Sequence, residues 1–395
     1  MKVKLSDLYD IGSSKRVFQS EWRESGVPFY RAREIAKLSD DGFVDNELFI
    51  DEELYSQYTE KYGKPETGDV MVTGVGTLGV CYVVKPEDRF YFKDGNILWF
   101  RQKAKDKILP EYLVKVFDSK EVKDFIAKNS SGTTVGTFTI QTAKKMEISL
   151  PSLDEQKKII DKIIRTESII KQRKKELQLL DTLIKARFVE MFGDPVINPK
   201  NLPVVTLGEL SELITKGASP SWQGFSYTDD GSQTLFVTSE NIREGYIDLS
   251  SPKYIEDGFN EKQSRSVIRK GDFLINIVGA SIGRAAQFNL DCKANMNQAA
   301  ALVRVKDNRI KSKYLLIYLN SDRAKRMYDS MKSDTGRANL SLQDISDLKI
   351  LLPAVDKQIE FENFVAQVDK SKSAVKKALD ETQLLFDSLM QEYFG

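Results

Sequence analysis

One segment of this chain occurs twice, and the repeat limits the possible folds more than any other feature. The residues LPSLDEQKKIIDKI from Leu150 return as LPAVDKQIEFENFV from Leu352. The two Leu-Pro steps are 353 − 151 = 202 positions apart, and Gln156 and Gln358 have the same separation. A chain of 395 residues has room for two such units, so the sequence predicts a pseudo-twofold molecule.

The similarity extends through the rest of each unit, with separations that drift between 202 and 207 positions. The drift indicates small loop insertions within one shared fold. Three further pairs of segments match: PFYRAREI with LFVTSENI, GDVMVTGVGTLG with GDFLINIVGASIG, and PEYLVKVFDS with SKYLLIYLNS.

The chain has no histidine, and this absence excludes several kinds of chemistry. Ser-His-Asp and Cys-His triads, histidine-dependent nucleases and most zinc sites cannot form. Cys81 and Cys292 lack a metal-binding spacing, and we expect both to be reduced thiols in a cytoplasmic protein. We also expect no membrane span and no signal peptide, because no apolar run has the required length.

Motifs of self-contained catalysis are missing as well. The chain has no P-loop, no adjacent prolines of the kind an adenine methyltransferase uses, and no convincing acidic set for a metal-dependent nuclease. We therefore predict a non-catalytic chain with no metal and no cofactor of its own. The net charge of +1 gives no sign of a nucleic-acid partner, so any phosphate-binding surface must come from local arrangement.

Each unit divides into a mixed domain and a long helix. The domains combine short β-rich runs with a few short helices, which predicts an α+β (mixed α/β) fold with Gly and Ser/Thr turns. A proline-rich stretch, GDPVINPKNLP, separates the two units. We expect these boundaries: 1–151 for the first domain, 152–193 for its helix, 194–203 for the linker, 204–353 for the second domain and 354–395 for its helix.

The two helical segments show a coiled-coil pattern. Apolar residues recur every seven positions, and residues 154–192 contain no proline or glycine. The first helix has a net charge of +3 and the second, over 356–394, a net charge of −3, which favours pairing with each other. The alternative is two solvated helix faces whose charges differ by chance. The expected seam residues are Ile159, Ile163, Ile170, Leu177, Leu180, Ile184, Phe361, Val365, Val368, Val375, Leu379, Phe386 and Leu389.

Two kinds of polar loop are candidates for binding. GVGTLG from Gly74 fits a dinucleotide-binding pattern, but the second copy, VGASIG from Val278, lacks the first glycine. A turn between strands is the better interpretation. SSGTTVGT from Ser130 corresponds to SDTGRANLS from Ser333, and such loops can contact phosphates and base edges or can simply be solvated.

A difference between the copies suggests two readers. Arg31 and Arg33 are placed by the alignment where the second copy has Ser239 and Asn241. Arginine pairs with guanine and asparagine with adenine. The same scaffold with different side chains at these positions therefore suits two different half-sites. Surface drift between duplicated domains explains any single position equally well.

The combination of LPSLDEQKKI and LPAVDKQIEF, each opening a long helix after a domain of ~150 residues, resembles the specificity subunit of a type I restriction–modification system. The resemblance implies two target-recognition domains that each dock on one half of a split, asymmetric DNA sequence. It implies that the helices pack antiparallel as a ruler. Two methyltransferase subunits carrying S-adenosylmethionine would bind around them, and motor-nuclease subunits would join for cleavage.

Under this interpretation, both domains contain DNA-binding residues. The expected phosphate anchors are Lys15, Arg16, Lys216 and Arg284, and the expected base readers are Arg31, Arg33, Asn241, Arg337 and Asn339. Further expected DNA contacts from the same loops are Thr73, Thr77, Ser131, Thr133, Thr134, Ser239, Arg243 and Ser281. A tandem protein-binding scaffold with a coiled-coil stem remains the alternative function.

Overall fold

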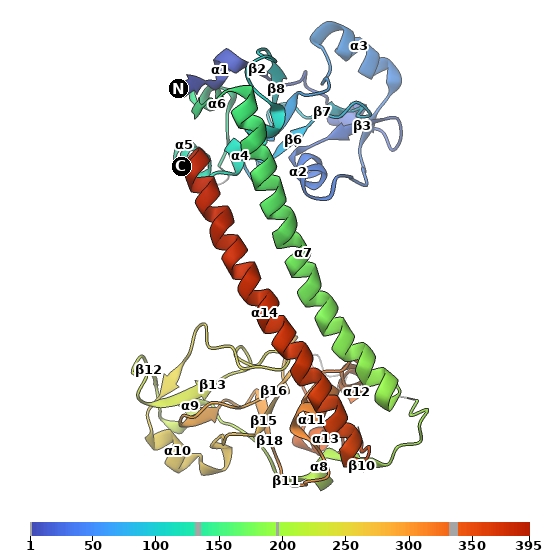
Figure 1. The fold of residues 1–395 in the computed structure, drawn as a ribbon, viewed down its shortest axis with the longest axis vertical. Helices are drawn as coiled ribbons and strands as arrows, with labels where there is room; N and C mark the ends of the chain where they lie inside the picture. The colour runs from blue at the N-terminus through green and yellow to red at the C-terminus, as the bar shows by residue number, and fades with distance from the viewer. Residues whose placement is uncertain (1, 131–135, 195–196, 332–338) are drawn as a thin grey trace. The chain divides into compact units, whose positions relative to one another are not determined.

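The computed structural model describes residues 2–130, 136–194, 197–331 and 339–395. The chain forms two compact units, drawn as a ribbon in Figure 1. Unit 1 comprises Met1–Lys175 and Lys376–Gly395, and unit 2 comprises Glu176–Val375. Each unit therefore contains one mixed domain together with one end of each long helix.

In unit 1, a four-stranded antiparallel sheet of order β2-β8-β5-β6 lies beside a three-stranded sheet of order β4-β3-β7, in which β3 and β7 are parallel. A third pair, β1 and β9, is antiparallel. The elements are β1 (Lys2–Lys4), α1 (Leu5–Leu8), β2 (Tyr9–Gly12), η1 (Gln19–Glu21), β3 (Val27–Tyr30), α2 (Ala32–Asp41), β4 (Phe49–Ile50), α3 (Glu52–Tyr62), β5 (Val70–Thr73), β6 (Cys81–Val83), β7 (Tyr91–Phe92), β8 (Ile97–Gln102), α4 (Pro110–Asp118), α5 (Lys120–Asn129), α6 (Ile140–Lys145) and β9 (Glu147–Ser149).

Unit 2 repeats this architecture. The sheet β11-β18-β15-β16 corresponds to β2-β8-β5-β6, and the sheet β12-β14-β13-β17 again contains one parallel pair, β13 and β17. Its elements are β10 (Val204–Thr206), α8 (Leu207–Leu210), β11 (Ser211–Lys216), α9 (Pro220–Gln223), β12 (Tyr227–Thr228), β13 (Thr234–Val237), β14 (Tyr254–Ile255), α10 (Gly258–Lys262), η2 (Ser264–Ser266), β15 (Phe273–Asn276), β16 (Ala285–Gln287), β17 (Ala294–Met296), β18 (Ala300–Val305), α11 (Ser312–Leu319), α12 (Asp322–Met331), α13 (Leu342–Ser346) and β19 (Lys349–Leu351).

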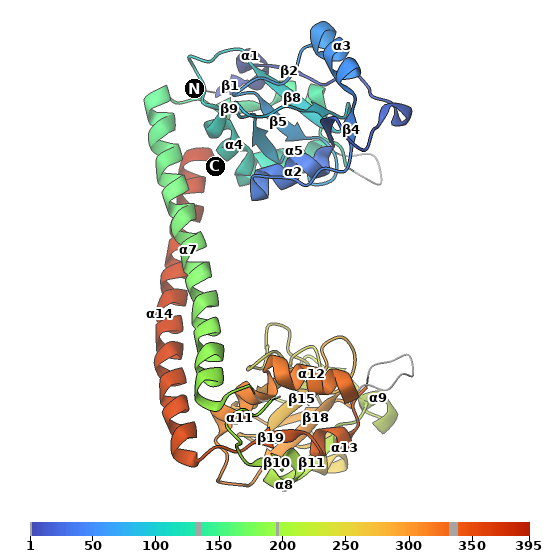
Figure 2. The ribbon, with the colours of Figure 1, turned by 90° about the vertical axis from the view of Figure 1, so that its right-hand side faces the viewer.

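The two long helices are α7 (Leu153–Phe192) and α14 (Val355–Phe394), each within one residue of the predicted start. In unit 1 the first half of α7 lies beside the last half of α14, and in unit 2 the other two halves meet, so the pair is antiparallel (Figures 1 and 2). In unit 2, Phe188 packs edge-on against Phe361 at 5.6 Å between ring centroids. Every predicted seam residue is buried or half-buried, which confirms the heptad interpretation.

The repeated glutamine of the Leu-Pro segment attaches each helix to its domain. The Gln156 amide accepts a hydrogen bond from Leu109 N (2.8 Å) and donates to the carbonyls of Lys107 (2.7 Å) and Pro151 (2.9 Å). The fully buried Gln358 makes the same three bonds at 2.8 Å in unit 2. Its partners are Lys311 N, Arg309 O and Pro353 O.

Candidate nucleic-acid interface

Four strands of unit 2 end at one edge of the domain, and the loops that follow them come together there. Asn297 N donates to Val237 O (3.1 Å), which joins the loop after β17 to the end of β13. The Asn276 amide at the end of β15 donates to Ser239 O (3.0 Å). We call this the loop edge of unit 2. It comprises residues 216–222, 238–243, 276–284, 297–299 and 339–340.

The loop after β11 reaches the same edge because Gly217 permits a very close approach. A Cβ at this position would be 1.8 Å from the Met296 carbonyl oxygen at the end of β17. Any side chain would push the two loops apart, so glycine is required here by space. The edge is therefore built from the ends of β11, β13, β15 and β17.

Unit 1 has a corresponding loop edge, which comprises residues 13–18, 31–34, 73–79, 93–96 and 136–138. Ser14 Oγ, after β2, donates to Phe92 O (2.6 Å) at the end of β7. Lys93 N donates to Tyr30 O (2.8 Å), which links the ends of β7 and β3. Gly74 N, after β5, donates to Asn96 O (2.8 Å). The same four strand ends thus meet in both domains.

The glycine loops singled out in the sequence are turns between antiparallel strands. One connects β5 to β6 and the other β15 to β16, which confirms the strand-turn interpretation. Each is tied to the end of the second polar loop, because Phe138 N donates to Gly74 O and Leu340 N to Ile277 O, both at 2.9 Å. The structure therefore brings together two loops that lie about 60 residues apart in sequence.

The structure corrects the alignment of the predicted base readers. Arg31 N donates to the Glu34 carboxylate and Thr238 N to the Asn241 side-chain oxygen, both at 2.9 Å. Both pairs are separated by 207 positions, as are the buried Ile35 and Ile242. Arg31 therefore corresponds to Thr238 and Arg33 to Glu240, not to Ser239 and Asn241. The matched segments PFYRAREI and LFVTSENI have the same separation of 207 positions throughout, so the predicted pairing was shifted by one residue.

Two predicted DNA contacts are buried by the loops they support. Asn241 is 7% exposed, and its amide bonds Thr238 and the carbonyl of Asp248. Thr73 is 1% exposed, and its hydroxyl donates to Thr77 O and accepts from Val80 N. Both side chains therefore fix the geometry of their loops and are not exposed at the loop edge.

Arg31 and Arg33 form an ion-pair cluster around Glu34. Arg31 Nη2 lies 2.8 Å and Arg33 Nε 2.9 Å from this buried carboxylate, and Arg33 Nη2 lies 2.7 Å from Glu47. Burial raises the pKa of Glu34, but the hydrogen bonds from Arg31 and Arg33 outweigh it and hold that pKa below its ordinary value. Arg33 is exposed, so its guanidinium is accessible at the loop edge although it is paired.

The other predicted DNA-binding residues differ in their exposure and in their ion pairs. Lys15, Lys216, Thr77 and Asn339 are exposed, whereas Ser239, Ser281 and Arg284 are half-buried. Arg284 makes no side-chain hydrogen bond or ion pair to another described residue, while Arg16 pairs with Asp94 (2.9 Å) and Arg243 with Asp248 (3.2 Å). The predicted contacts outside the described residues are Ser131, Thr133, Thr134 and Arg337.

Exposed aromatic side chains at the loop edges were missed by the sequence analysis. Trp222 follows β11 and Phe18 follows β2, and both are exposed. The available signal was an aromatic residue among small and polar ones, in SPSWQG and KRVFQS. That pattern was not distinctive, because an aromatic residue in a loop usually packs into the core.

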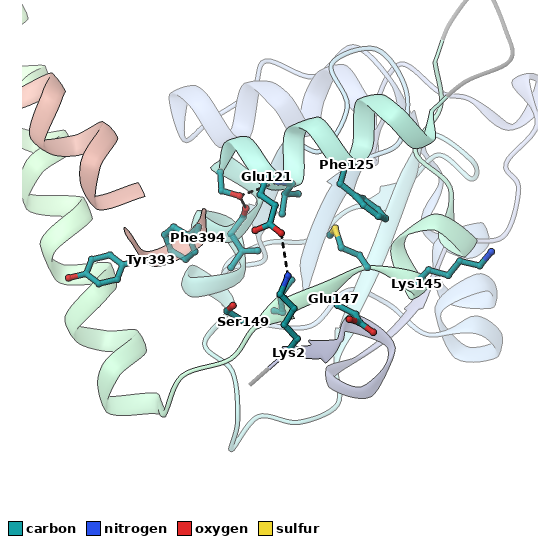
Figure 3. Close-up of a pocket in the computed structure, with 13 residues that line it drawn as sticks. Lys2, Glu121, Phe125, Lys145, Glu147, Ser149, Tyr393 and Phe394 are labelled. Atoms are coloured by element: carbon teal, nitrogen blue, oxygen red, sulfur yellow. Dashed lines mark hydrogen bonds and ion pairs between the residues drawn. The ribbon is translucent and has the colours of Figure 1, made fainter. Parts of the chain in front are cut away.

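A separate hollow of about 260 Å³ lies in unit 1 between α5, the β1–β9 pair and the end of α14 (Figure 3). Lys2 and Glu121 form an ion pair across it at 3.5 Å, and Phe125, Tyr393 and Phe394 supply apolar walls. None of its lining residues belongs to the loop edge, so the hollow is distinct from the candidate interface.

Two absences hold for the described ranges. No group of three or more Cys, Asp or Glu side chains is arranged to hold a metal ion there. A membrane-crossing helix is also missing from these ranges, since none of their helices combines the necessary length with the necessary apolar character.

The chain thus contains a duplicated mixed domain with two antiparallel helices and the same loop edge in each copy. The family model "Type I restriction modification DNA specificity domain" matches residues 1–179 and again residues 199–382. The chain therefore belongs to this family of type I restriction–modification DNA specificity proteins, and it contains two copies of the domain.

Individual relatives agree with this assignment. The EcoBI specificity subunit of Escherichia coli is 23% identical over all of this chain and 85% of its own length. A putative specificity subunit of Haemophilus influenzae is 29% identical, but the match spans 42% of this chain and only 40% of that relative.

Solved structures show the same fold over the whole chain. A type I restriction–modification structure, described for complex assembly and conformational transition, has a TM-score of 0.66 at 19% identity and covers 100% of this chain and 97% of its own. The S subunit of M. genitalium has a TM-score of 0.54 at 15% identity and covers 100% and 96%.

Proposed function

We propose that this chain confers DNA sequence specificity on a type I restriction–modification complex, and that each loop edge reads one half of a split, asymmetric target. The observation that carries the proposal is one backbone frame with different side chains at corresponding positions. Arg31 stands where unit 2 has Thr238, and Arg33 where it has Glu240. Two domains with the same backbone but different side chains at these positions suit two different DNA half-sites.

Phosphate contacts belong to the exposed cations of the loop edges. Lys15 follows β2 and Lys216 is the last residue of β11, and neither forms an ion pair with another described residue. Arg284, on the β15–β16 turn, is half-buried and makes no ion pair with another described residue, so we add it to this set. Such cations position a protein on the duplex without reading its sequence, whereas Asn339, Ser239 and Ser281 can reach base edges.

The helices offer surfaces for partner subunits. In unit 2, a groove of about 630 Å³ has an apolar floor that includes Ile184, Leu316 and Val365, with charged residues around it. In unit 1, Leu384 and Leu385 of α14 are exposed. We propose that two methyltransferase subunits dock on these surfaces and supply S-adenosylmethionine and the adenine chemistry, and that motor-nuclease subunits join them.

This division of labour makes the chain itself non-catalytic. Its target is intracellular DNA, so the complex works in the cytoplasm. Removing the chain should therefore abolish the choice of methylation site without removing the methyltransferase active site.

Methylome sequencing tests the proposal. A host carrying this gene with its neighbouring methyltransferase gene is compared with a host carrying the methyltransferase gene alone. We expect adenine methylation at one split, asymmetric motif that occurs only with this chain. If both proteins are soluble and co-purify but no motif appears, the proposal is wrong and a tandem protein-binding scaffold becomes the better description.

A further inference from the structure

Each loop edge exposes one large apolar ring. Trp222 in unit 2 is 89% exposed and Phe18 in unit 1 is 58% exposed. Neither ring stacks on another described aromatic side chain. Exposed apolar residues are common on protein surfaces, so exposure alone indicates nothing. The position and the support of these two rings carry the argument.

The rings occupy corresponding places in the two domains. Gly12 of β2 pairs with Trp99, and Thr215 of β11 pairs with Leu302; 215 − 12 and 302 − 99 both equal 203. Phe18 lies six residues after Gly12 and Trp222 seven residues after Thr215. The duplicated loop therefore presents an aromatic residue to solvent in both copies, within one position.

The Trp222 loop is held firmly at both ends. Its short helix α9 begins with Pro220, is capped by Gly224 with φ +85°, and is closed by a bond from Phe225 N to Pro220 O (3.0 Å). The Phe225 ring packs against Phe259 at 5.5 Å. The loop therefore holds the indole in solvent on a fixed backbone.

The Phe18 loop is fixed by other contacts with the same result. Lys15 N donates to the Tyr91 hydroxyl (3.0 Å), and the neighbouring Val17 is buried. Phe18 N donates to the Glu21 carboxylate (2.7 Å) at the start of η1. Burial of Val17 directs the next side chain outward, so Phe18 is presented by the fold.

The groups next to these rings suit a polyanion with flat apolar faces. Lys15 and Arg16 precede Phe18, while Lys216, Ser219 and Ser221 precede Trp222 on its loop. Cations and hydroxyls bind phosphate oxygens, and an aromatic ring stacks on a base. Apolar side chains of this kind also insert between base pairs and unstack them.

We propose that Trp222 and Phe18 are wedges that insert at a base step, one in each half-site, and unstack it. The inference rests on the proposed function, because it names how the same loop edges engage DNA. The wedges add a preference for base steps that deform easily, at positions that no polar side chain reads. The larger indole makes the half-site of unit 2 the more strongly distorted one.

The test uses the full chain in complex with its methyltransferase and the duplex that methylome sequencing identifies. 2-Aminopurine is placed at successive steps of each half-site, and its fluorescence reports unstacking. We expect an increase at one step per half-site with the wild type. Trp222→Ala should abolish the increase in the unit 2 half-site and weaken binding about tenfold or more, and Phe18→Ala should act on the other half-site.

Trp222→Phe should retain part of both effects, because a smaller ring still stacks. Phe43→Ala is the matched control, since Phe43 is an exposed aromatic residue outside the loop edge. Thermal melting verifies that each variant is folded. The wedge inference is overturned if Trp222→Ala and Phe18→Ala bind the duplex with unchanged affinity and give the wild-type 2-aminopurine fluorescence. It is also overturned if their sole defect is failure to bind the methyltransferase subunit. If the wild-type complex methylates no motif, the proposed function itself has failed.

Discussion

A buried glutamine amide hydrogen-bonds each long helix to its domain, and its contribution can be tested by exchanging the amide nitrogen for oxygen. Gln156→Glu and Gln358→Glu keep the acceptor but remove the donor to two carbonyls and bury a carboxylate. We expect each variant to lower the free energy of unfolding by about 2–4 kcal/mol, as unsatisfied buried groups do. Urea denaturation measures the loss. Gln178→Glu, on the exposed face of α7, is the control. Equal losses of unfolding free energy for all three variants would contradict the role of Gln156 and Gln358 in attaching the helices.

We expect Glu34 to make unit 1 sensitive to acid. Burial raises the pKa of Glu34, but the hydrogen bonds from Arg31 and Arg33 lower it by more. The folded pKa therefore lies below the unfolded value of ~4.3. The stabilisation by the Glu34 ion pairs is therefore complete above the unfolded pKa and is lost as the pH falls through the lower pKa of the folded state. We expect the melting temperature of unit 1 to fall steeply below about pH 4 and Glu34→Gln to flatten that decline. Glu60→Gln, at an exposed position, should leave the pH profile unchanged.

Among the elements, the β15–β16 turn depends on a glycine for two separable reasons. Gly283 has φ +85°, and a Cβ there would be 2.3 Å from the Tyr328 ring of α12. Gly279 of the same turn has φ +83° but open space around it. Gly279→Ala therefore measures backbone strain alone, at ~1 kcal/mol, and Gly283→Ala should cost roughly 1–3 kcal/mol more through overpacking. Equal losses of unfolding free energy would show that Tyr328 yields without cost.

The same scale shows what sequence can and cannot predict. The heptad pattern depends on local periodicity, so it predicted the helix starts within one residue and the seam without error. The mixed α+β character of the duplicated domains was also predicted, because the two copies support each other. The predicted base readers were harder to place, because the burial of Asn241 and the pairing of Arg33 with Glu34 and Glu47 depend on how the loops fold, which residue type and spacing do not give. Trp222 was missed because its exposure results from how α9 is anchored.

For the whole molecule, the pairing of the helices is specified more by the seam than by charge. Arg187 of α7 bonds Glu360 of α14 at 3.0 Å, in the direction that the net charges predict. Lys372 of α14 and Asp181 of α7 pair at 2.6 Å in the opposite direction. These pairs lie near solvent, where each is worth about 1 kcal/mol or less. The buried rings of Phe188 and Phe361 and the apolar seam therefore dominate.

If the helix pair sets the distance between half-sites, its length should determine the target spacer in steps that respect the DNA helix. One heptad inserted into both helices, after Lys175 and after Val375, adds ~10.5 Å, or about three base pairs, which rotates the DNA by ~100°. Three heptads add ~31 Å, or about nine base pairs, which is close to a full turn. We therefore expect the one-heptad variant to lose methylation and the three-heptad variant to methylate the same half-sites with a spacer nine or ten base pairs longer. Methylome sequencing gives the result, and three heptads in α7 alone should disrupt the pairing and abolish methylation. A three-heptad variant that still methylates the original spacer would show that the helices do not measure the target.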